Sequence, residues 1–450
     1  MKGPGRSGLR NTGDGILFLE YEHERMRPEA AISPMLPAMF YGWWIVASVF
    51  IAQLFMVGFI TYAFPLIIVS VREDFGATAT EINMAMTASA MVGIFLPPLV
   101  GPLVDRWSAR WLMVLGAIAL VSSLVLLSLT QGVVQFVLVF ALFMATANTL
   151  LGPVTGSALV SRWFTTSRGK ALGIAATGTS VGGVILPFLA TDWLSAWGWR
   201  TTLQALALLT AACVLPMLLF ALRDHPAEKG LEPQGQGADA IGTLAGEPAG
   251  SLLSNRDILG SRSYWLMGIC FGLLFMGYSA LLGNLGLYVK GQGLDSSVSL
   301  TLISLVAFFG FVGKIVLGTA SDRIGLRTGL WISLGLAGLG IALFSVEPDY
   351  PVLIVAAALL GLAAGGMLPV WGGMVAAAFG TENFGRAMGL ISPLIVVIVM
   401  PGFAIAGWSE DTTGSFSLGL QFFVGQIVFA SILLLGLNLD SNSSQGEDSE

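Results

Sequence analysis

Long apolar stretches recur along the sequence from residue 42 almost to the C-terminus. The hydrocarbon core of a bilayer is about 30 Å thick, and a helix needs about 20 apolar residues to cross it. Only 11% of the 450 residues are charged, whereas a soluble domain carries about 25%. We therefore predict an all-α membrane protein with twelve transmembrane helices. The twelve stretches are residues 42–70, 82–104, 111–130, 133–159, 170–191, 200–222, 263–289, 297–320, 328–346, 351–377, 386–408 and 416–438.

A charged segment between the second and third stretches is repeated later in the chain. Asp105 and Asp322 lie 217 positions apart, and a second pair of similar segments, 168–173 and 384–389, keeps nearly the same spacing. A period of about half the chain indicates an internal duplication. It predicts two pseudo-symmetric six-helix halves at 41–222 and 263–438, joined by a cytoplasmic linker loop at 223–262. The linker is predicted to hold a short surface helix near 252–259. We expect residues 1–40 to form a cytoplasmic tail and 439–450 a disordered tail.

The positions of the basic residues predict the orientation in the membrane. With both termini in the cytoplasm, 17 of the 21 Lys and Arg residues fall in cytoplasmic segments. Because positive charge is retained on the cytoplasmic side during insertion, we predict that both termini face the cytoplasm.

Cys213 and Cys270 both fall inside apolar stretches, so neither a disulfide nor a metal site is predicted.

The repeated charged segment resembles the signature between helices 2 and 3 of the major facilitator superfamily. The family pattern is Gly, then Asp-Arg four positions later, then Gly and Arg. The matching residues are Gly101, Asp105, Arg106 and Arg110 in the first copy, and Gly318, Asp322, Arg323, Gly325 and Arg327 in the second. The resemblance covers residues 40–438. It implies a multi-pass transporter that works by alternating access, as a monomer and without a cofactor.

Several shorter segments resemble bacterial members of the monocarboxylate porter and oxalate/formate antiporter group. They are residues 41–46, 157–164, 198–200 and 223–226. This narrower resemblance implies a protein of the bacterial inner (plasma) membrane that moves small carboxylates, often together with protons. The group typically places a cation in helix 8, and this chain has Lys314 at that position.

Lys314 is the ionisable residue placed well inside a predicted span. A Lys near the centre of a helix costs about 2.5–3.5 kcal/mol on insertion scales, so such a residue is a functional candidate. We predict that its ammonium group faces a central cavity and pairs with the carboxylate of a substrate. A second carboxylate would lack a partner, which favours a monocarboxylate. The alternative is a lysine whose stem bends toward the lipid headgroups.

Neutral polar and aromatic residues supply the remaining substrate-binding candidates. Asn148 and Gln53 are hydrogen-bonding residues near mid-depth, and each could bind a substrate or join two helices. Tyr278, Asn284, Trp371 and Tyr62 belong to helices that line the cavity in the family that the chain resembles. Packing is the alternative role for these four side chains. Spans 10 and 11 contain Pro369, Pro393 and Pro401, so we expect both to be kinked or locally unwound.

The residues of the repeated segment are gating candidates. The resemblance implies that Asp105 and Asp322 each approach the N-terminus of a neighbouring helix, where the helix dipole favours negative charge. The basic residues beside them would complete a charged latch that opens when the two halves rock. They are Arg106, Arg110, Arg323 and Arg327. The alternative is that these arginines only determine topology.

The sequence thus predicts a secondary transporter for a small organic anion. Symport with protons, exchange and uniport all stay open. The alternative is an exporter of amphipathic drug-like compounds, whose cavity would be apolar if Lys314 points away from it. An enzyme is not predicted, because His23 and His225 both fall outside the spans. Nor is a nucleic-acid partner, because the basic residues form no continuous patch. A sensor that binds a solute would need an output domain larger than the tails and the linker.

Overall fold

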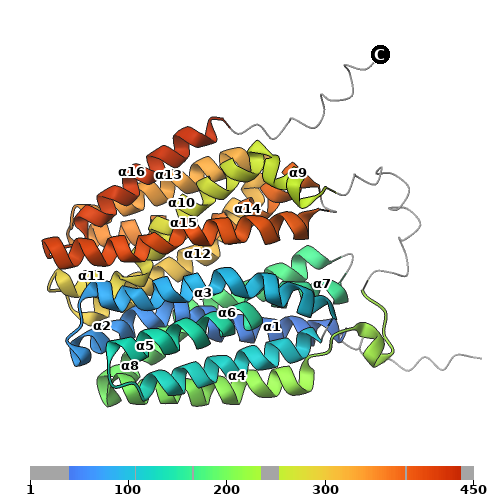
Figure 1. Ribbon diagram of the computed structural model, residues 1–450, viewed down its shortest axis with the longest axis horizontal. Coiled ribbons are helices and arrows are strands. Elements are labelled where there is room, and N and C mark those ends of the chain that lie inside the picture. Colours follow the sequence, from blue (N-terminus) through green and yellow to red (C-terminus); the bar gives the residue numbers. More distant parts are fainter. Residues whose placement is uncertain (1–39, 107, 165–166, 235–252, 381–382, 437–450) are drawn as a thin grey trace, which may run out of the picture. The chain divides into compact units, whose positions relative to one another are not determined.

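The computed structural model describes residues 40–106, 108–164, 167–234, 253–380 and 383–436 (Figure 1). At positions 97–106, 154, 168, 169 and 322 it describes the backbone only. The described secondary structure is helical apart from one isolated bridge between Phe164 and Gln234. The predicted tails, apart from Phe40, and residues 235–252 of the predicted linker lie outside the described residues.

The N-terminal half contains six membrane crossings. The first is α1 (Gly42–Val57), the π-helical turn η1 (Gly58–Ala63) and α2 (Phe64–Phe75), and the next two are α3 (Ala79–Arg106) and α4 (Ala109–Ser128). The fourth is built from α5 (Val133–Val139), η2 (Phe140–Met144), α6 (Ala145–Leu151) and α7 (Pro153–Trp163). The fifth and sixth are α8 (Arg168–Pro216) and η3 (Met217–Ala221), and the 3-10 turn η4 (Pro226–Lys229) follows.

The C-terminal half adds six crossings. A short helix, α9 (Asn255–Gly260), lies where the sequence predicts one and precedes α10 (Arg262–Gly283) and α11 (Leu285–Gly291), which form the seventh crossing. The remaining five are α12 (Ser296–Ile324), α13 (Leu326–Ser345), α14 (Tyr350–Phe379), α15 (Phe384–Thr413) and α16 (Ser417–Leu434).

The helix labelled α8 makes two crossings rather than one. Eleven helical segments in the described part of the chain are long and apolar enough to cross a membrane, and the longest runs from Lys170 to Ala221 over 52 residues. At 1.5 Å per residue a straight helix of that length would measure about 78 Å, more than twice the thickness of the bilayer core. Gly198 breaks it with φ 75° and ψ 169°, a backbone conformation that glycine adopts without strain. Counting α8 twice gives twelve crossings, which confirms the predicted fold class.

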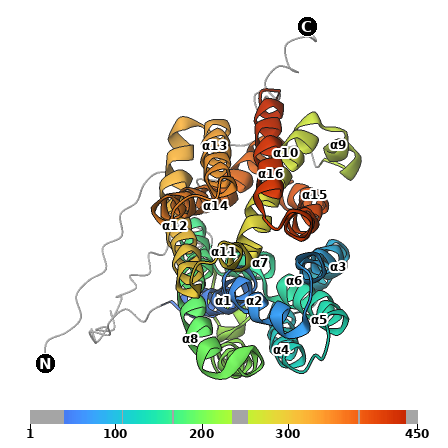
Figure 2. The ribbon, with the colours of Figure 1, turned by 90° about the vertical axis from the view of Figure 1, so that its left-hand side faces the viewer.

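Two seams join the halves within residues 40–436. In one seam α8 packs against α12, and in the other α3 packs against α15, while α2 packs against α11 between them. Figure 2 looks along the helices and shows the α8–α12 and α3–α15 pairs on opposite sides of the bundle. These three contacts between the halves surround the space that lies between the two halves.

Close helix packing explains the glycines in the first part of α8. A Cβ atom on Gly178 would lie 2.3 Å from the Phe50 carbonyl oxygen, and one on Gly182 would lie 2.2 Å from that of Leu54. Both distances are far below van der Waals contact, so any larger residue would force α1 and α8 apart. Small residues four apart are a common means of bringing membrane helices together.

The interrupted helices are not those that the prolines predict. Helices α14 and α15 contain Pro369, Pro393 and Pro401 but run without interruption over 30 residues each, so the prediction of local unwinding is wrong there. The fourth crossing is interrupted instead at Gly152, where ψ is −175°, and the seventh at Asn284, with φ −106° and ψ 6°. Because Pro153 has no N–H, the Thr149 carbonyl lacks its usual helical donor. It accepts a hydrogen bond from the Thr155 hydroxyl at 3.1 Å.

Candidate functional site: a central cavity closed at one end

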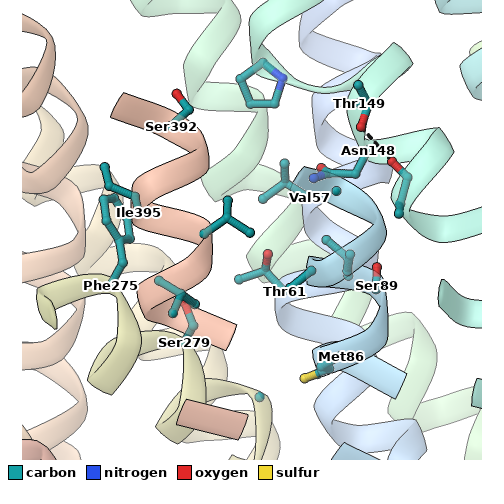
Figure 3. Close-up of a pocket in the computed structure, with 18 of the residues that line it drawn as sticks. Val57, Thr61, Met86, Ser89, Asn148, Thr149, Phe275, Ser279, Ser392 and Ile395 are labelled. Carbon is teal, nitrogen blue, oxygen red and sulfur yellow. Dashed lines mark hydrogen bonds between the residues drawn. The ribbon is translucent and has the colours of Figure 1, made fainter. Parts of the chain in front are cut away.

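A cavity of about 570 Å³ lies between the two halves (Figure 3). Its N-terminal wall comes from α1, η1, α3, η2, α6 and α7, and its C-terminal wall from α10, α14 and α15. In Figure 3, Thr61, Ser89 and Asn148 lie on one side, and Ser279 and Ser392 on the other. Small-molecule sites usually measure about 300–1,000 Å³, so this cavity is large enough for a drug-sized solute.

The described lining of the cavity carries no charged side chain. The lining residues include no Lys, Arg, His, Asp or Glu. The polar groups are hydroxyls, the Asn148 amide and the Trp371 indole, set among apolar side chains such as Phe140, Phe275 and Leu368. A solute in this space would meet apolar surface and a few neutral hydrogen-bonding groups.

Three of the predicted substrate-binding residues line the cavity. They are Asn148 from α6, Tyr278 from α10 and Trp371 from α14. The Asn148 side chain is exposed to the cavity, whereas the Trp371 indole N–H is buried and has no hydrogen-bond partner among the described residues. An unpaired buried donor costs about 1–3 kcal/mol.

Three other candidates lie outside the lining, and two of them, Tyr62 and Asn284, contact the other half in this conformation. Gln53 is buried on α1 against Gly156. Tyr62 of η1 and Tyr278 of α10 are both buried, and their side chains interact across the two halves. Asn284 exchanges two hydrogen bonds with Asn83 of α3, at 2.7 and 2.9 Å between amide nitrogen and oxygen, and both residues are buried.

Lys314 lies in the seam between α8 and α12, away from the cavity lining. Its Nζ donates to the Thr179 hydroxyl at 2.5 Å, the Ser180 hydroxyl at 2.9 Å and the Ala176 carbonyl oxygen at 3.3 Å. All three acceptors belong to α8 of the other half. Among the described residues no carboxylate pairs with Lys314. The structure therefore shows its side chain neither in the cavity nor turned toward headgroups, but holding the two halves together.

One end of the bundle, which we call the closed end, is sealed by charged contacts between the halves. This is the end that holds the α2–α3 and α15–α16 turns. Arg72 of α2 makes a bidentate salt bridge with Glu410 of α15, with N–O distances of 2.9 and 3.0 Å. Glu73 pairs with Lys290 of α11. Behind these pairs lie the Asn83–Asn284 and Tyr62–Tyr278 contacts, so polar links between the halves continue from the closed end inward.

Asp411 adds a contact of another kind at the closed end. Its carboxylate oxygens accept hydrogen bonds from the backbone N–H groups of Ala79 and Thr80, both at 2.8 Å. These groups begin α3, where the helix dipole favours a negative charge. Thr78 and Glu81 form a reciprocal capping box at the same helix end, so α3 is capped from its own half and from the other half at once.

The gating candidates lie at the opposite end, which we call the tail end because α1 begins there and α16 finishes there. The side chains of Asp105, Arg106 and Asp322 lie outside the described residues. The Arg110 backbone N–H donates to Asp224 at 2.9 Å, and Arg327 donates to the Leu435 carbonyl at 3.0 Å. Arg323 is exposed. Both of these hydrogen bonds stay within one half.

At the tail end of the N-terminal half, the Asp224 carboxylate meets the N-terminus of α4. It accepts hydrogen bonds from the Ser108 hydroxyl and the Arg110 backbone at the start of α4, and it lies 3.9 Å from Arg162. In the sequence Asp224 lies in the segment 223–226, which we identified only by its resemblance to a transporter group. That resemblance marked the segment but did not predict that Asp224 caps α4.

Twelve crossings arranged as two halves around a central cavity that is sealed at one end define a multi-pass membrane transporter. The model of the Major Facilitator Superfamily matches residues 49–335 and 297–445, so this chain belongs to that family. It moves a small substrate and is not an enzyme.

Individual relatives agree on the family and differ in their substrates. The agnestins efflux protein AgnL12 of Paecilomyces divaricatus is 28% identical over 340 residues, which cover 74% of this chain and 72% of that protein. Monocarboxylate transporter 11 of Mus musculus is 22% identical over 410 residues, 88% of this chain and 87% of that one. The solved structure of a bacterial homologue of the human lysosomal transporter Spinster, inward-facing and unoccupied, matches with a TM-score of 0.67 at 14% identity. That match covers 88% of this chain and 96% of that one.

Proposed function

We propose that this protein transports an amphipathic organic solute of drug-like size. The observation that carries the proposal is the cavity: about 570 Å³ in volume, with a described lining that is apolar apart from neutral hydrogen-bonding groups. A small monocarboxylate would fill only part of it and would leave its charge without a cation in the described lining. A larger solute can bury more apolar surface in the cavity. Each Å² of apolar surface removed from water contributes about 25 cal/mol of favourable binding free energy. One of the relatives is named as an agnestins efflux protein, which supports an exporter.

The polar groups on the two walls supply the selectivity in this proposal. The exposed Asn148 amide can both donate and accept a hydrogen bond, and Ser279 and Ser392 offer hydroxyls from the opposite wall. Apolar contact with Phe275 and Leu368 would hold the body of the solute. We keep Asn148, Tyr278 and Trp371 as proposed substrate-binding residues on this basis.

We further propose that both termini face the cytoplasm of a bacterial cell and that the transporter lies in the inner membrane as a monomer. In that orientation the closed end is the outer end, and this conformation faces inward. The 17 basic residues in the predicted cytoplasmic segments support this orientation. The test is Ala77→Cys at the α2–α3 turn, in a background without Cys213 and Cys270. Labelling by a membrane-impermeant thiol reagent in intact cells is expected, and labelling only after permeabilisation contradicts the orientation.

Transport in proteoliposomes tests the proposed function. Purified protein is given a panel of amphipathic aromatic compounds and a panel of small monocarboxylates, with and without a proton gradient. Saturable movement of amphipathic compounds is expected, and Asn148→Ala and Trp371→Ala should weaken it. A matched control is Ser195→Ala, which changes an exposed hydroxyl that bonds only within α8. Transport confined to small monocarboxylates would contradict the proposal.

A second candidate function is transport of a small monocarboxylate, with Lys314 as the partner of the carboxylate. The observation in its favour is the alignment with monocarboxylate transporter 11 over 88% of this chain, together with a cation in the eighth crossing. Here Lys314 would have to leave its α8 acceptors to reach the cavity. Uptake of one acid that Lys314→Gln abolishes would establish this function in place of the first.

A further inference from the structure

The contacts of Lys314 place a positive charge in the seam where two moving parts meet. Its ammonium group has three hydrogens, and its three acceptors are all on α8. Lys314 itself is on α12, so every one of these hydrogen bonds crosses from the C-terminal to the N-terminal half. The acceptors are neutral, which means that hydrogen bonding alone compensates the charge.

Glycines near Lys314 let α12 pack closely against α14. A Cβ atom on Gly365 of α14 would lie 2.6 Å from the Lys314 backbone nitrogen, and one on Gly313 would lie 2.4 Å from the Leu362 carbonyl oxygen. The two helices therefore touch backbone to backbone at this level. With its backbone fixed against α14, Lys314 can release α8 only by moving its side chain or by a movement of the whole C-terminal half.

The position of these bonds separates them from the other polar links between the halves. The described charged links between the halves all lie at the closed end. They are the Arg72–Glu410 pair, the Glu73–Lys290 pair and the contact of Asp411 with the start of α3. Lys314 lies ten residues before the tail end of α12, and its acceptors lie eight to twelve residues after the start of α8. At about 1.5 Å per residue, both sets are about 12–18 Å from the tail end.

We propose that Lys314 is a positioning residue that fastens α12 to α8 in this conformation and has to release α8 during each transport cycle. In this fold the halves rock against each other around a central site, so a set of bonds that spans the α8–α12 seam cannot stay unchanged. A buried ammonium that loses its acceptors is costly. Lys314 therefore stabilises the conformation that is sealed at the closed end, without contacting the solute.

This inference goes beyond the proposed function because it concerns the conformational equilibrium without any solute. The readout is the reactivity of Ser279→Cys, a cavity position, in protein without Cys213 and Cys270. A membrane-impermeant thiol reagent added at the closed end reaches this position only when that end opens. The variants are Lys314→Met, which removes the charge but keeps the length, and Thr179→Val with Ser180→Ala, which removes two acceptors and leaves the lysine.

Both changes are expected to raise the labelling rate by about five- to twentyfold, in the same direction, with no solute present. Combining them should add little to either one, because residues in a shared network are non-additive. Lys314→Arg should stay closer to the native rate. Thermal melting of each purified variant checks folding, and the acceptor variants carry the test where Lys314→Met does not fold.

Two results would overturn the inference. One is a labelling rate equal to that of the native protein in the acceptor variants, because the proposed role of Lys314 requires its acceptors on α8 as well as the lysine. The other is a Lys314→Met variant that labels like native protein without solute and differs only when a carboxylate is present, which is the behaviour of a substrate ligand. The labelling rate without solute does not depend on which solute is moved, so the inference can fail while the proposed function holds, and the reverse.

Discussion

The two ends of the bundle use charge in different ways. At the closed end three charged contacts cross between the halves: Arg72 with Glu410, Glu73 with Lys290, and Asp411 with the start of α3. The exposed pair of Asp74 and Arg200 at this end stays within the N-terminal half. At the tail end the described charged groups pair within one half, as Asp224 does with the start of α4. Pairs within a half can persist through a rocking motion, whereas pairs between halves must break.

The difference identifies which contacts set the conformation and which set the fold. Removing a contact between halves should move the equilibrium toward a state open at the closed end. Removing a contact within a half should lower stability and leave that equilibrium in place. The labelling of Ser279→Cys from the closed end measures the first effect, and thermal melting measures the second.

Glu410→Gln should have the largest effect on the equilibrium. The pair with Arg72 is bidentate, and both side chains are mostly buried, with 16% and 26% of their surfaces exposed. Charge-assisted hydrogen bonds of this kind contribute about 1.5–3 kcal/mol, which corresponds to a rise in labelling of about 10–150-fold. The amide oxygen of this variant can still accept one hydrogen bond from Arg72, which also keeps its bond to the Ala77 carbonyl, but the negative charge and the second bond are lost. An unchanged labelling rate would show that the salt bridge does not hold this end closed.

Asp411→Ala should come next. It removes a carboxylate that accepts hydrogen bonds from two backbone N–H groups of α3. Loss of a helix cap costs about 1 kcal/mol, so we expect labelling to rise about fivefold. Asp411→Asn is the matched control, because an amide oxygen can still accept one of these bonds. If alanine and asparagine variants label equally and like the native protein, the cap across the halves is unimportant.

Lys290→Met should have a small effect. Lys290 and its partner Glu73 are 49% and 57% exposed, and exposed ion pairs contribute about 0–1 kcal/mol. The expected rise in labelling is below about fivefold and should disappear in high salt, since salt screens exposed charges. A larger, salt-independent rise would mean that this pair belongs with the buried links.

Asp224→Ala should leave the labelling rate unchanged while lowering the melting temperature. Its bonds to Ser108 and Arg110 and its contact with Arg162 join parts of the N-terminal half only. Breaking a partly buried network of this kind lowers the free energy of unfolding by about 1–3 kcal/mol. A marked change in labelling at an unchanged melting temperature would break the proposed distinction between the two ends.

The fold could be predicted from the sequence because the bilayer imposes one strong rule. Every crossing needs about 20 apolar residues in a helix, and the repeated segment around Asp105 and Asp322 reveals the two halves. Even the close approach at Gly178 and Gly182 follows from residue size. Gly173 also lies in α8, but an added Cβ atom there would have no neighbour within 4 Å. The sequence does not show which face of the helix meets a neighbour, so it does not distinguish Gly173 from Gly178 and Gly182.

The site was harder to predict because it depends on how side chains pair across 200 or more residues. Asn284 was a candidate for substrate binding, but its partner is Asn83, 201 positions away. Glu410 and Asp411 read as residues of an exposed turn until Arg72 and the start of α3 are placed beside them. The depth of Lys314 was predictable from the spacing of apolar residues. Its direction, toward α8 and away from the cavity, was not.

One binding measurement tests the central claim, that the solute is held by an uncharged cavity. The purified protein is titrated with an aromatic carboxylic acid and with its neutral primary amide, molecules of nearly the same shape that differ in charge. We predict that the amide binds at least as tightly as the acid and that Lys314→Met leaves its affinity within about threefold of native. Binding of the acid alone, lost in Lys314→Met, would contradict the account and make Lys314 the substrate's partner.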